Sequence, residues 1–245
     1  MPRYKIVIEY LGTNYAGWQQ QPSNKTIQGE IQEALLKFCA ESIKIFASGR
    51  TDAGVHALGQ VAHFDLSQEL KPTDILQGLN FYLKSSDIAI LEVHLATPEF
   101  DARFSAIRRH YMYKIINRPA PSAIYRHSAL HIARNLQIIK MQQAAQHFIG
   151  QHDFSAFQAS QCMAKSSIRT IYQLSLDKQD QIIQIRICAN SFLHHMVRNI
   201  VGTLLIVGDA KITPESISKI IASKSRSMAG PKAPAHGLYL TKVDY

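Results

Sequence analysis

One short segment of this chain combines an acid, a base and two glycines. Residues 48–56 read Ser-Gly-Arg-Thr-Asp-Ala-Gly-Val-His, so that Arg50 and Asp52 lie between two glycines. Glycine lets a ligand approach the backbone closely, and a cation within about 4 to 6 Å lowers the pKa of a carboxyl group by roughly 1 to 3 units. Arg50 could therefore keep Asp52 ionised, the form that a nucleophile or a general base requires. The alternative is a tight turn in which Asp52 only accepts hydrogen bonds from nearby backbone N–H groups.

Aromatic and basic side chains are interleaved in a second segment, residues 104–114. If this segment is a strand, Tyr111 and Tyr113 share one face, and Arg108 and Lys114 lie on the other. Rings beside cations suit nucleic acid, because an aromatic side chain stacks on an unpaired base at about 1 to 3 kcal/mol per base. Either tyrosine could instead belong to the core, and the pattern alone does not decide between the two.

A third candidate is the run of residues around two adjacent histidines, His194 and His195. With Arg198 four residues after His194, a helix here could present a cationic edge to phosphate, although Arg198 could equally be a buried arginine. Adjacent residues point about 100° apart on a helix, so the two histidines are poor joint metal ligands. His127 and His131 lack a Glu or Cys partner. No metal site is expected.

The charge of the chain is distributed unevenly. The sequence has 245 residues, with 27 Lys and Arg against 18 Asp and Glu, for a net charge of +9. Residues 1–120 are nearly balanced, whereas residues 121–245 hold most of the surplus, and residues 102–152 contain no acid at all. Such an acid-free basic stretch indicates a polyanionic partner.

Several classes of protein do not fit this sequence. The glycine loop lacks the Gly-Lys-Ser or Gly-Lys-Thr of a nucleotide-binding P-loop. Three widely spaced cysteines, an odd number, favour free cytosolic thiols over a disulfide framework. The N-terminus alternates apolar and polar residues and does not resemble a signal peptide, and the most apolar long segment, residues 192–207, is interrupted by polar side chains. We therefore expect a cytoplasmic protein with no membrane span.

The first half is predicted to run strand, helix, strand, strand, helix, strand. The residue patterns place these elements at residues 3–10, 27–38, 43–47, 59–66, 73–83 and 88–95, with Thr26 as the cap of the first helix. That order is the split βαβ pattern of ferredoxin-like folds.

The second half is predicted to be similar in outline. It has a strand at 110–117, a helix at 138–149, a hairpin of strands 169–176 and 182–189, a long helix capped by Asn190 or Ser191, a short helix after Pro214 and a last strand at 237–243. We expect an α+β protein of two halves, residues 1–105 and 106–245, with mostly antiparallel pairing.

Four segments, in this order, closely resemble the TruA family of tRNA pseudouridine synthases. They are residues 48–57 (SGRTDAGVHA), 100–115 (FDARFSAIRRHYMYKI), 192–204 (FLHHMVRNIVGTL) and 229–245 (AGPKAPAHGLYLTKVDY). The resemblance implies the pseudouridine synthase fold, in which two ferredoxin-like halves form a largely antiparallel central sheet flanked by helices, with a basic cleft.

The resemblance also implies an activity and roles for two residues, to which we add an expected role for Arg50. Members of the family isomerise uridine to pseudouridine in the anticodon stem-loop of tRNA, at positions 38 to 40, without a cofactor and as homodimers. The catalytic aspartate of the family falls on Asp52 and its active-site tyrosine on Tyr111. Arg50 would orient Asp52 and could occupy the gap left by a flipped base. Two alternatives stay open on the residues alone, a non-catalytic RNA-binding module and a glycosidase that releases the base.

Overall fold

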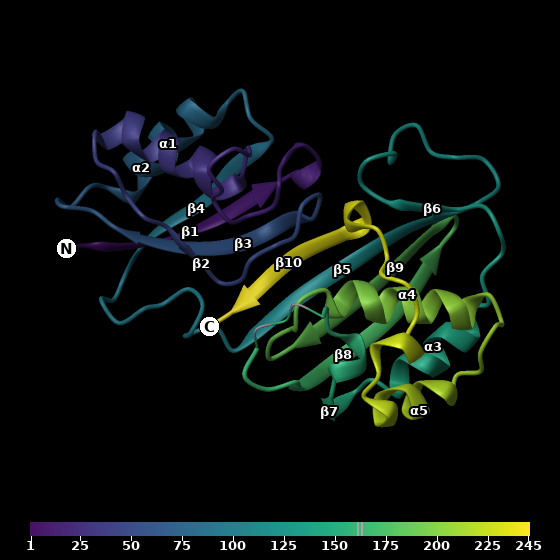
Figure 1. Cartoon of the computed structure of the whole chain (residues 1–245). Helices are drawn as coiled ribbons and strands as arrows, with labels where there is room; N and C mark the ends of the chain where they lie inside the picture. Colours follow the sequence, from purple (N-terminus) through teal and green to yellow (C-terminus); the bar gives the residue numbers. More distant parts are fainter. Residues whose placement is uncertain (161, 163) are drawn as a thin grey trace. The chain divides into compact units, whose positions relative to one another are not determined.

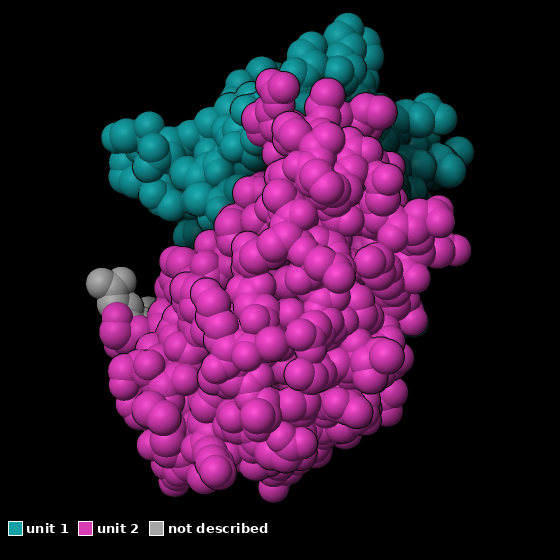
Figure 2. Space-filling model, turned by 90° about the vertical axis from the view of Figure 1, so that its right-hand side faces the viewer, with its two compact units in different colours: residues 1–107, 239–245 teal, residues 108–238 magenta. Residues whose placement is uncertain are grey.

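The computed structural model describes residues 1–160, 162 and 164–245. By backbone contacts the chain divides into two compact units, coloured separately in Figure 2. Unit 1 comprises residues 1–107 with 239–245, and unit 2 comprises residues 108–238. The C-terminal strand therefore groups with unit 1, whereas it was predicted to belong to the second half.

Unit 1 contains the predicted ferredoxin-like order of elements. Its elements are β1 (Arg3–Tyr10), α1 (Ile27–Cys39), β2 (Phe46–Ala47), β3 (His56–Asp65), α2 (Pro72–Leu83), β4 (Ile88–Ala96) and the C-terminal β10 (Leu238–Asp244). The sheet runs β4–β1–β3, with β2 antiparallel on β3. β10 adds a strand parallel to β3. The antiparallel order 4-1-3-2 confirms the split βαβ prediction for this half.

The core of unit 1 lies between this sheet and its two helices. Tyr4, Ile6 and Ile8 of β1 are fully buried, as the strict alternation of that strand predicts. Figure 1 shows α1 and α2 together on one face of the sheet; the two helices pack on each other, and α2 also packs on β4. α1 begins where predicted, because the Thr26 side chain accepts a hydrogen bond of 3.2 Å from the backbone N–H of Gly29.

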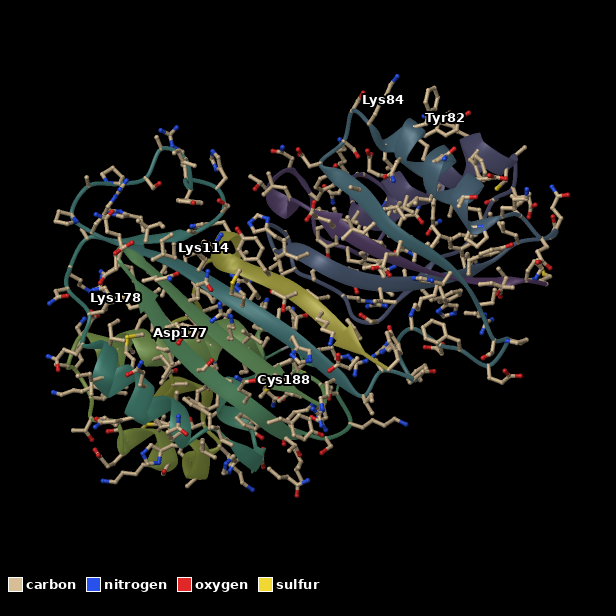
Figure 3. All side chains as sticks on the ribbon, turned by 180° about the vertical axis from the view of Figure 1, so that it is seen from behind. Tyr82, Lys84, Lys114, Asp177, Lys178 and Cys188 are labelled. Atoms are coloured by element: carbon tan, nitrogen blue, oxygen red, sulfur yellow. The ribbon has the colours of Figure 1, made fainter. Side chains whose placement is uncertain are left out.

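Unit 2 has a sheet with helices on one face. Its elements are β5 (Arg108–Asn117), β6 (Leu130–Ile132), α3 (Ile138–Gln146), β7 (Gly150–Asp153), β8 (Ile168–Gln179), β9 (Ile182–Ala189), α4 (Met196–Gly208) and α5 (Ser216–Ser223). The order is β5–β9–β8–β7, antiparallel throughout, with β6 parallel on β5. α3 packs on α4 and on β8, and Figure 3 shows the opposite face of the sheet from behind, with Lys114 and Asp177 on it.

The strand predicted at 43–47 and the start of the long helix differ from the sequence prediction. The predicted strand at 43–47 pairs only at Phe46–Ala47. α4 begins at Met196 instead of just after Asn190, because His195 adopts a left-handed backbone with φ 63°, which a helix cannot contain. The Asn190 side chain accepts hydrogen bonds from the backbone N–H groups of Thr170 and Ser191 instead of capping the helix.

Short 3₁₀ turns complete the chain. They lie at Gly12–Asn14, Ser155–Phe157, Arg226–Met228 and Ala235–Gly237. In the described part of the chain, no helix combines the length and the hydrophobicity needed to cross a membrane.

Candidate active site

Asp52 lies in the loop that connects β2 to β3 in unit 1. The backbone N–H of Val55 donates a 3.1 Å hydrogen bond to the Asp52 carbonyl oxygen, which closes a tight turn. Gly54 occupies this turn with φ 78°, a conformation that favours glycine. The Asp52 side chain is half-buried, and that of Arg50 is exposed.

A buried glutamine fixes the first residues of this loop. Gln60 of β3 has no exposed surface. Its Oε1 accepts a 2.7 Å hydrogen bond from the Ser48 hydroxyl, and its Nε2 donates a 2.9 Å bond to the Gly49 carbonyl oxygen. A buried amide that is fully hydrogen-bonded costs little to bury and holds its partners in one geometry.

A buried tyrosine fixes the residue directly before Asp52. The hydroxyl of Tyr10, at the end of β1, shares a 2.7 Å hydrogen bond with Thr51 Oγ1. Burial raises the pKa of Tyr10 to about 12, although hydrogen bonds with Thr51 and Gln60 oppose the shift. The phenol therefore stays protonated at neutral pH and keeps this bond.

The segment after β1 packs against the backbone of the same loop. The backbone N–H of Trp18 donates a 3.1 Å hydrogen bond to the Thr51 carbonyl oxygen, and the backbone N–H of Gly12 donates a 2.9 Å bond to Nδ1 of His56. A Cβ atom at Gly17 would lie 2.7 Å from the Thr51 carbonyl oxygen, and one at Gly12 would lie 2.0 Å from the carbonyl oxygen of Val55. Only glycine permits this approach at either position.

Arg50 forms no ion pair with Asp52 in the described part of the chain. Among the described residues, the Arg50 side chain makes no hydrogen bond or ion pair. The side chain of Arg50 is exposed and therefore accessible to a ligand. The backbone contacts of Thr51 and Gly49 hold the loop without it.

The two tyrosines of the second candidate segment have different environments in unit 2. Tyr113 is fully buried, and its hydroxyl donates a 2.8 Å hydrogen bond to the Pro234 carbonyl oxygen. Burial raises the pKa of Tyr113 well above its ordinary value. Tyr111 is half-buried, with its ring edge-on to Phe192 at 5.2 Å between centroids. Tyr113 is thus a core residue, and Tyr111 is the tyrosine of the pair with accessible surface.

Basic side chains of the acid-free stretch pack on rings or bind carbonyl groups in unit 2. The Arg108 guanidinium lies 4.8 Å from the centre of the Tyr172 ring, and Lys114 Nζ lies 5.2 Å from that of Tyr125. Burial lowers the pKa of Lys114. Arg134 forms an ion pair with Asp209, which lies outside the stretch. One cation of the stretch is therefore paired with an acid from outside it.

The third candidate segment does not form the expected cationic edge on a helix. His194 and His195 precede α4, and their rings lie 3.8 Å apart. The prediction that the two side chains point about 100° apart on a helix is therefore wrong. Arg198 is buried and donates a 2.7 Å hydrogen bond to the Ala233 carbonyl oxygen. Within either unit taken by itself, the described residues bring no three possible metal-ligating side chains together.

The residues that hold the loop were not predicted from the sequence. Tyr10 appears in the sequence only as the last apolar position of an alternating strand. Gln60 gives a clearer signal, because it is a polar residue within the mostly buried β3. Arg50 and Asp52 belong to unit 1, and Tyr111 belongs to unit 2.

The whole chain is similar to known enzymes of tRNA modification. The family model for tRNA pseudouridine synthase matches residues 6–105 and 144–245. A tRNA pseudouridine synthase A from Parvibaculum lavamentivorans is 44% identical over 245 residues, and one from Sinorhizobium fredii is 43% identical over 247 residues, each covering 100% of both chains. A solved chain of a Cbf5–Nop10–Gar1 complex aligns at 11% identity over 96% of this chain and 57% of its own, with a TM-score of 0.40, too low to support an argument. By the family match and the full-length relatives, this chain is a member of the tRNA pseudouridine synthase family.

Proposed function

We propose a target position and a catalytic group for this chain, which by its family membership is an isomerase that acts on tRNA. We propose that it converts uridine to pseudouridine in the anticodon stem-loop, at positions 38 to 40, with Asp52 as the nucleophile or base. The observation that carries this assignment is the half-buried carboxylate on a loop whose backbone is fixed by Thr51 and Gly49. A group held in one geometry is what proximity catalysis requires.

The reaction needs only rearrangement within the substrate. The N-glycosidic bond between N1 of uracil and C1′ of the ribose breaks, the base turns, and a bond forms between C5 and C1′. The proton on C5 is lost and one is gained at N1, so that the product is an isomer of uridine. In our proposal Asp52 acts at C1′ or on the sugar, and the balance requires no oxidant and no reductant.

The target base must leave the stack before a protein carboxylate can reach its sugar. Extrusion costs a few kcal/mol. We propose that Arg50 enters the space left by the base, because its side chain is exposed and makes no bond within the described protein. We propose that Tyr111 stacks on the extruded uracil, since its ring keeps accessible surface and is braced by Phe192. If Tyr111→Phe turned over at the wild-type rate, the hydroxyl of Tyr111 would be dispensable and the ring alone would account for its role.

Product analysis tests the proposed reaction and its position. Purified protein would be incubated with an unmodified anticodon stem-loop whose uridines lie at positions 38 to 40, and with a matched one in which cytidine replaces them. We expect pseudouridine at these positions of the first substrate and no free uracil. Free uracil would show a base-releasing glycosidase. An unchanged first substrate, with pseudouridine formed elsewhere in full-length tRNA, would contradict the anticodon assignment.

Two further properties are proposed from the resemblance to the family. We propose that the protein works as a homodimer in the cytoplasm. Sedimentation of the purified chain at two concentrations distinguishes a dimer from a monomer, and a monomer under turnover conditions would contradict this proposal.

A further inference from the structure

We propose that the hydroxyl of Tyr10 is a positioning group for the catalytic loop. Through its bond to Thr51 it fixes the peptide that precedes Asp52, and it thereby sets the turnover rate and not the affinity for tRNA. This inference rests on the proposed role of Asp52.

The geometry ties this hydroxyl to the loop from the core side. Tyr10 is 2% exposed, and its ring packs at 6.2 Å from that of Trp18. Its hydroxyl lies 2.7 Å from Thr51 Oγ1, and Thr51 directly precedes Asp52. The carbonyl oxygen of Thr51 accepts a 3.1 Å hydrogen bond from the backbone N–H of Trp18. Side chain and backbone of Thr51 are thus held at once, which leaves the peptide between Thr51 and Asp52 little freedom to rotate.

The ring and the hydroxyl of Tyr10 have different partners. A phenylalanine at position 10 would fill the same volume and keep the contact with the Trp18 ring. The hydroxyl bonds to Thr51, a loop residue, and it also interacts with Gln60, whose amide binds Ser48 and Gly49 at the start of the loop. Both of its partners therefore act on the segment that carries Asp52, which is the reason to assign the group a role in the reaction.

The effect is expected in turnover. Misplacement of a catalytic group by about 1 Å can cost about 10²-fold in rate. In Tyr10→Phe we expect kcat to fall by about 10- to 100-fold and KM for tRNA to change by less than about threefold, because Tyr10 is buried and does not face a ligand. Steady-state kinetics on unmodified tRNA would measure both constants.

Unit 1 offers a matched control on the same strand. Tyr4 of β1 is also fully buried, and its hydroxyl donates to the Leu70 carbonyl oxygen and accepts from the Leu70 N–H, both at 2.8 Å. Leu70 is remote in sequence from the Asp52 loop. We expect Tyr4→Phe to lower the melting temperature at least as much as Tyr10→Phe does, with kcat unchanged. A purely structural role of Tyr10 would give the two variants the same turnover.

A double mutant shows whether the bond itself is responsible. Thr51→Val removes the same bond from the loop side and keeps the shape of the side chain, so it also provides the measurement if Tyr10→Phe does not fold. If one bond carries the effect, kcat of Tyr10→Phe/Thr51→Val should equal that of the more impaired single variant. Independent, multiplying losses would overturn the inference.

The outcomes separate this inference from the proposed function. Activity retained in Asp52→Asn would refute the role of Asp52, whatever Tyr10→Phe shows. An inactive Asp52→Asn, together with turnover in Tyr10→Phe equal to that in Tyr4→Phe, would refute the positioning role alone. A rise in KM with unchanged kcat in Tyr10→Phe would also overturn it, because the hydroxyl would then act on binding.

Discussion

A methyl group at Gly17 should displace the loop that carries Asp52. The Cβ of Gly17→Ala would lie 2.7 Å from the Thr51 carbonyl oxygen, and contacts become ordinary only at about 3.4 Å. The difference, 3.4 − 2.7, requires a shift of about 0.7 Å between the two segments. Because a displacement of about 1 Å can cost about 10²-fold in rate, we expect kcat to fall by roughly tenfold or more.

The same substitution also strains the backbone, and a second glycine separates the two effects. Gly17 has φ 96° and Gly150, in unit 2, has φ 104°. A Cβ at Gly150 would meet only the His152 ring, at 3.6 Å, which is an ordinary contact. Both variants should lose roughly 1 kcal/mol of stability from a side chain at positive φ, a shift of about 2 to 4 °C in melting temperature for a chain of this size.

Turnover should distinguish the two variants. The assay is single-turnover pseudouridine formation on unmodified tRNA at saturating protein, with thermal unfolding of the same samples. We expect Gly17→Ala to be slow and Gly150→Ala to match the wild type. Equal rates in two folded variants would refute the argument that the close approach of Gly17 positions the loop.

Two further predictions concern pH and salt. Hydrogen bonds from Ser155 and Ser167, with Lys224 at 3.2 Å, hold the pKa of Asp153 well below its ordinary value. A lowered carboxyl pKa stabilises the fold above the unfolded value of about 3.9. Wild type should therefore be more stable than Asp153→Asn at pH 7 in urea unfolding, with the gap closing below about pH 4, and a gap independent of pH would contradict this. If Arg50 binds a phosphate, Arg50→Ala should reduce the slope of log K for tRNA against log salt by about 0.7 to 0.9. The control Lys37→Ala removes a cation already paired with Glu33 at 2.6 Å and should leave the slope unchanged; equal slopes in both variants would exclude a phosphate contact by Arg50.

The sequence predicted elements well where local pattern and tertiary packing agree. β1 matches its predicted bounds because its alternation faces a single core, and α1 begins at its predicted cap, Thr26. β6 and β7 were missed because strands of three and four residues are too short to show a period. The strand predicted at 43–47 is mostly unpaired, although Ile43 and Ile45 are buried. Alternation of apolar residues indicates which side chains are buried, but a buried side chain need not belong to a strand that is hydrogen-bonded in a sheet.

The candidate site was predicted in part. A loop between two strands, with glycines around an acid, could be recognised from residue types, and the structure places Asp52 there. The contacts that hold this loop could not be predicted, because Gly17 and Gln60 reach it from segments distant in sequence. The burial of Arg198 was also undecided, since helical spacing does not say whether a guanidinium meets solvent or a carbonyl oxygen. The basic cleft and the roles of Asp52, Tyr111 and Arg50 stay predictions.

Replacement of the Asp52 carboxylate by its amide tests the proposed chemistry with the least change of shape. Asp52→Asn and the control Asp74→Asn, which alters an exposed carboxylate at the start of α2, would be compared with wild type. The comparison would use pseudouridine formation on unmodified tRNA, tRNA binding and thermal unfolding. We predict that Asp52→Asn folds and binds tRNA yet forms no pseudouridine, while Asp74→Asn is as active as wild type. Pseudouridine formed by Asp52→Asn at a rate near that of wild type would contradict the assignment of Asp52 as the catalytic group.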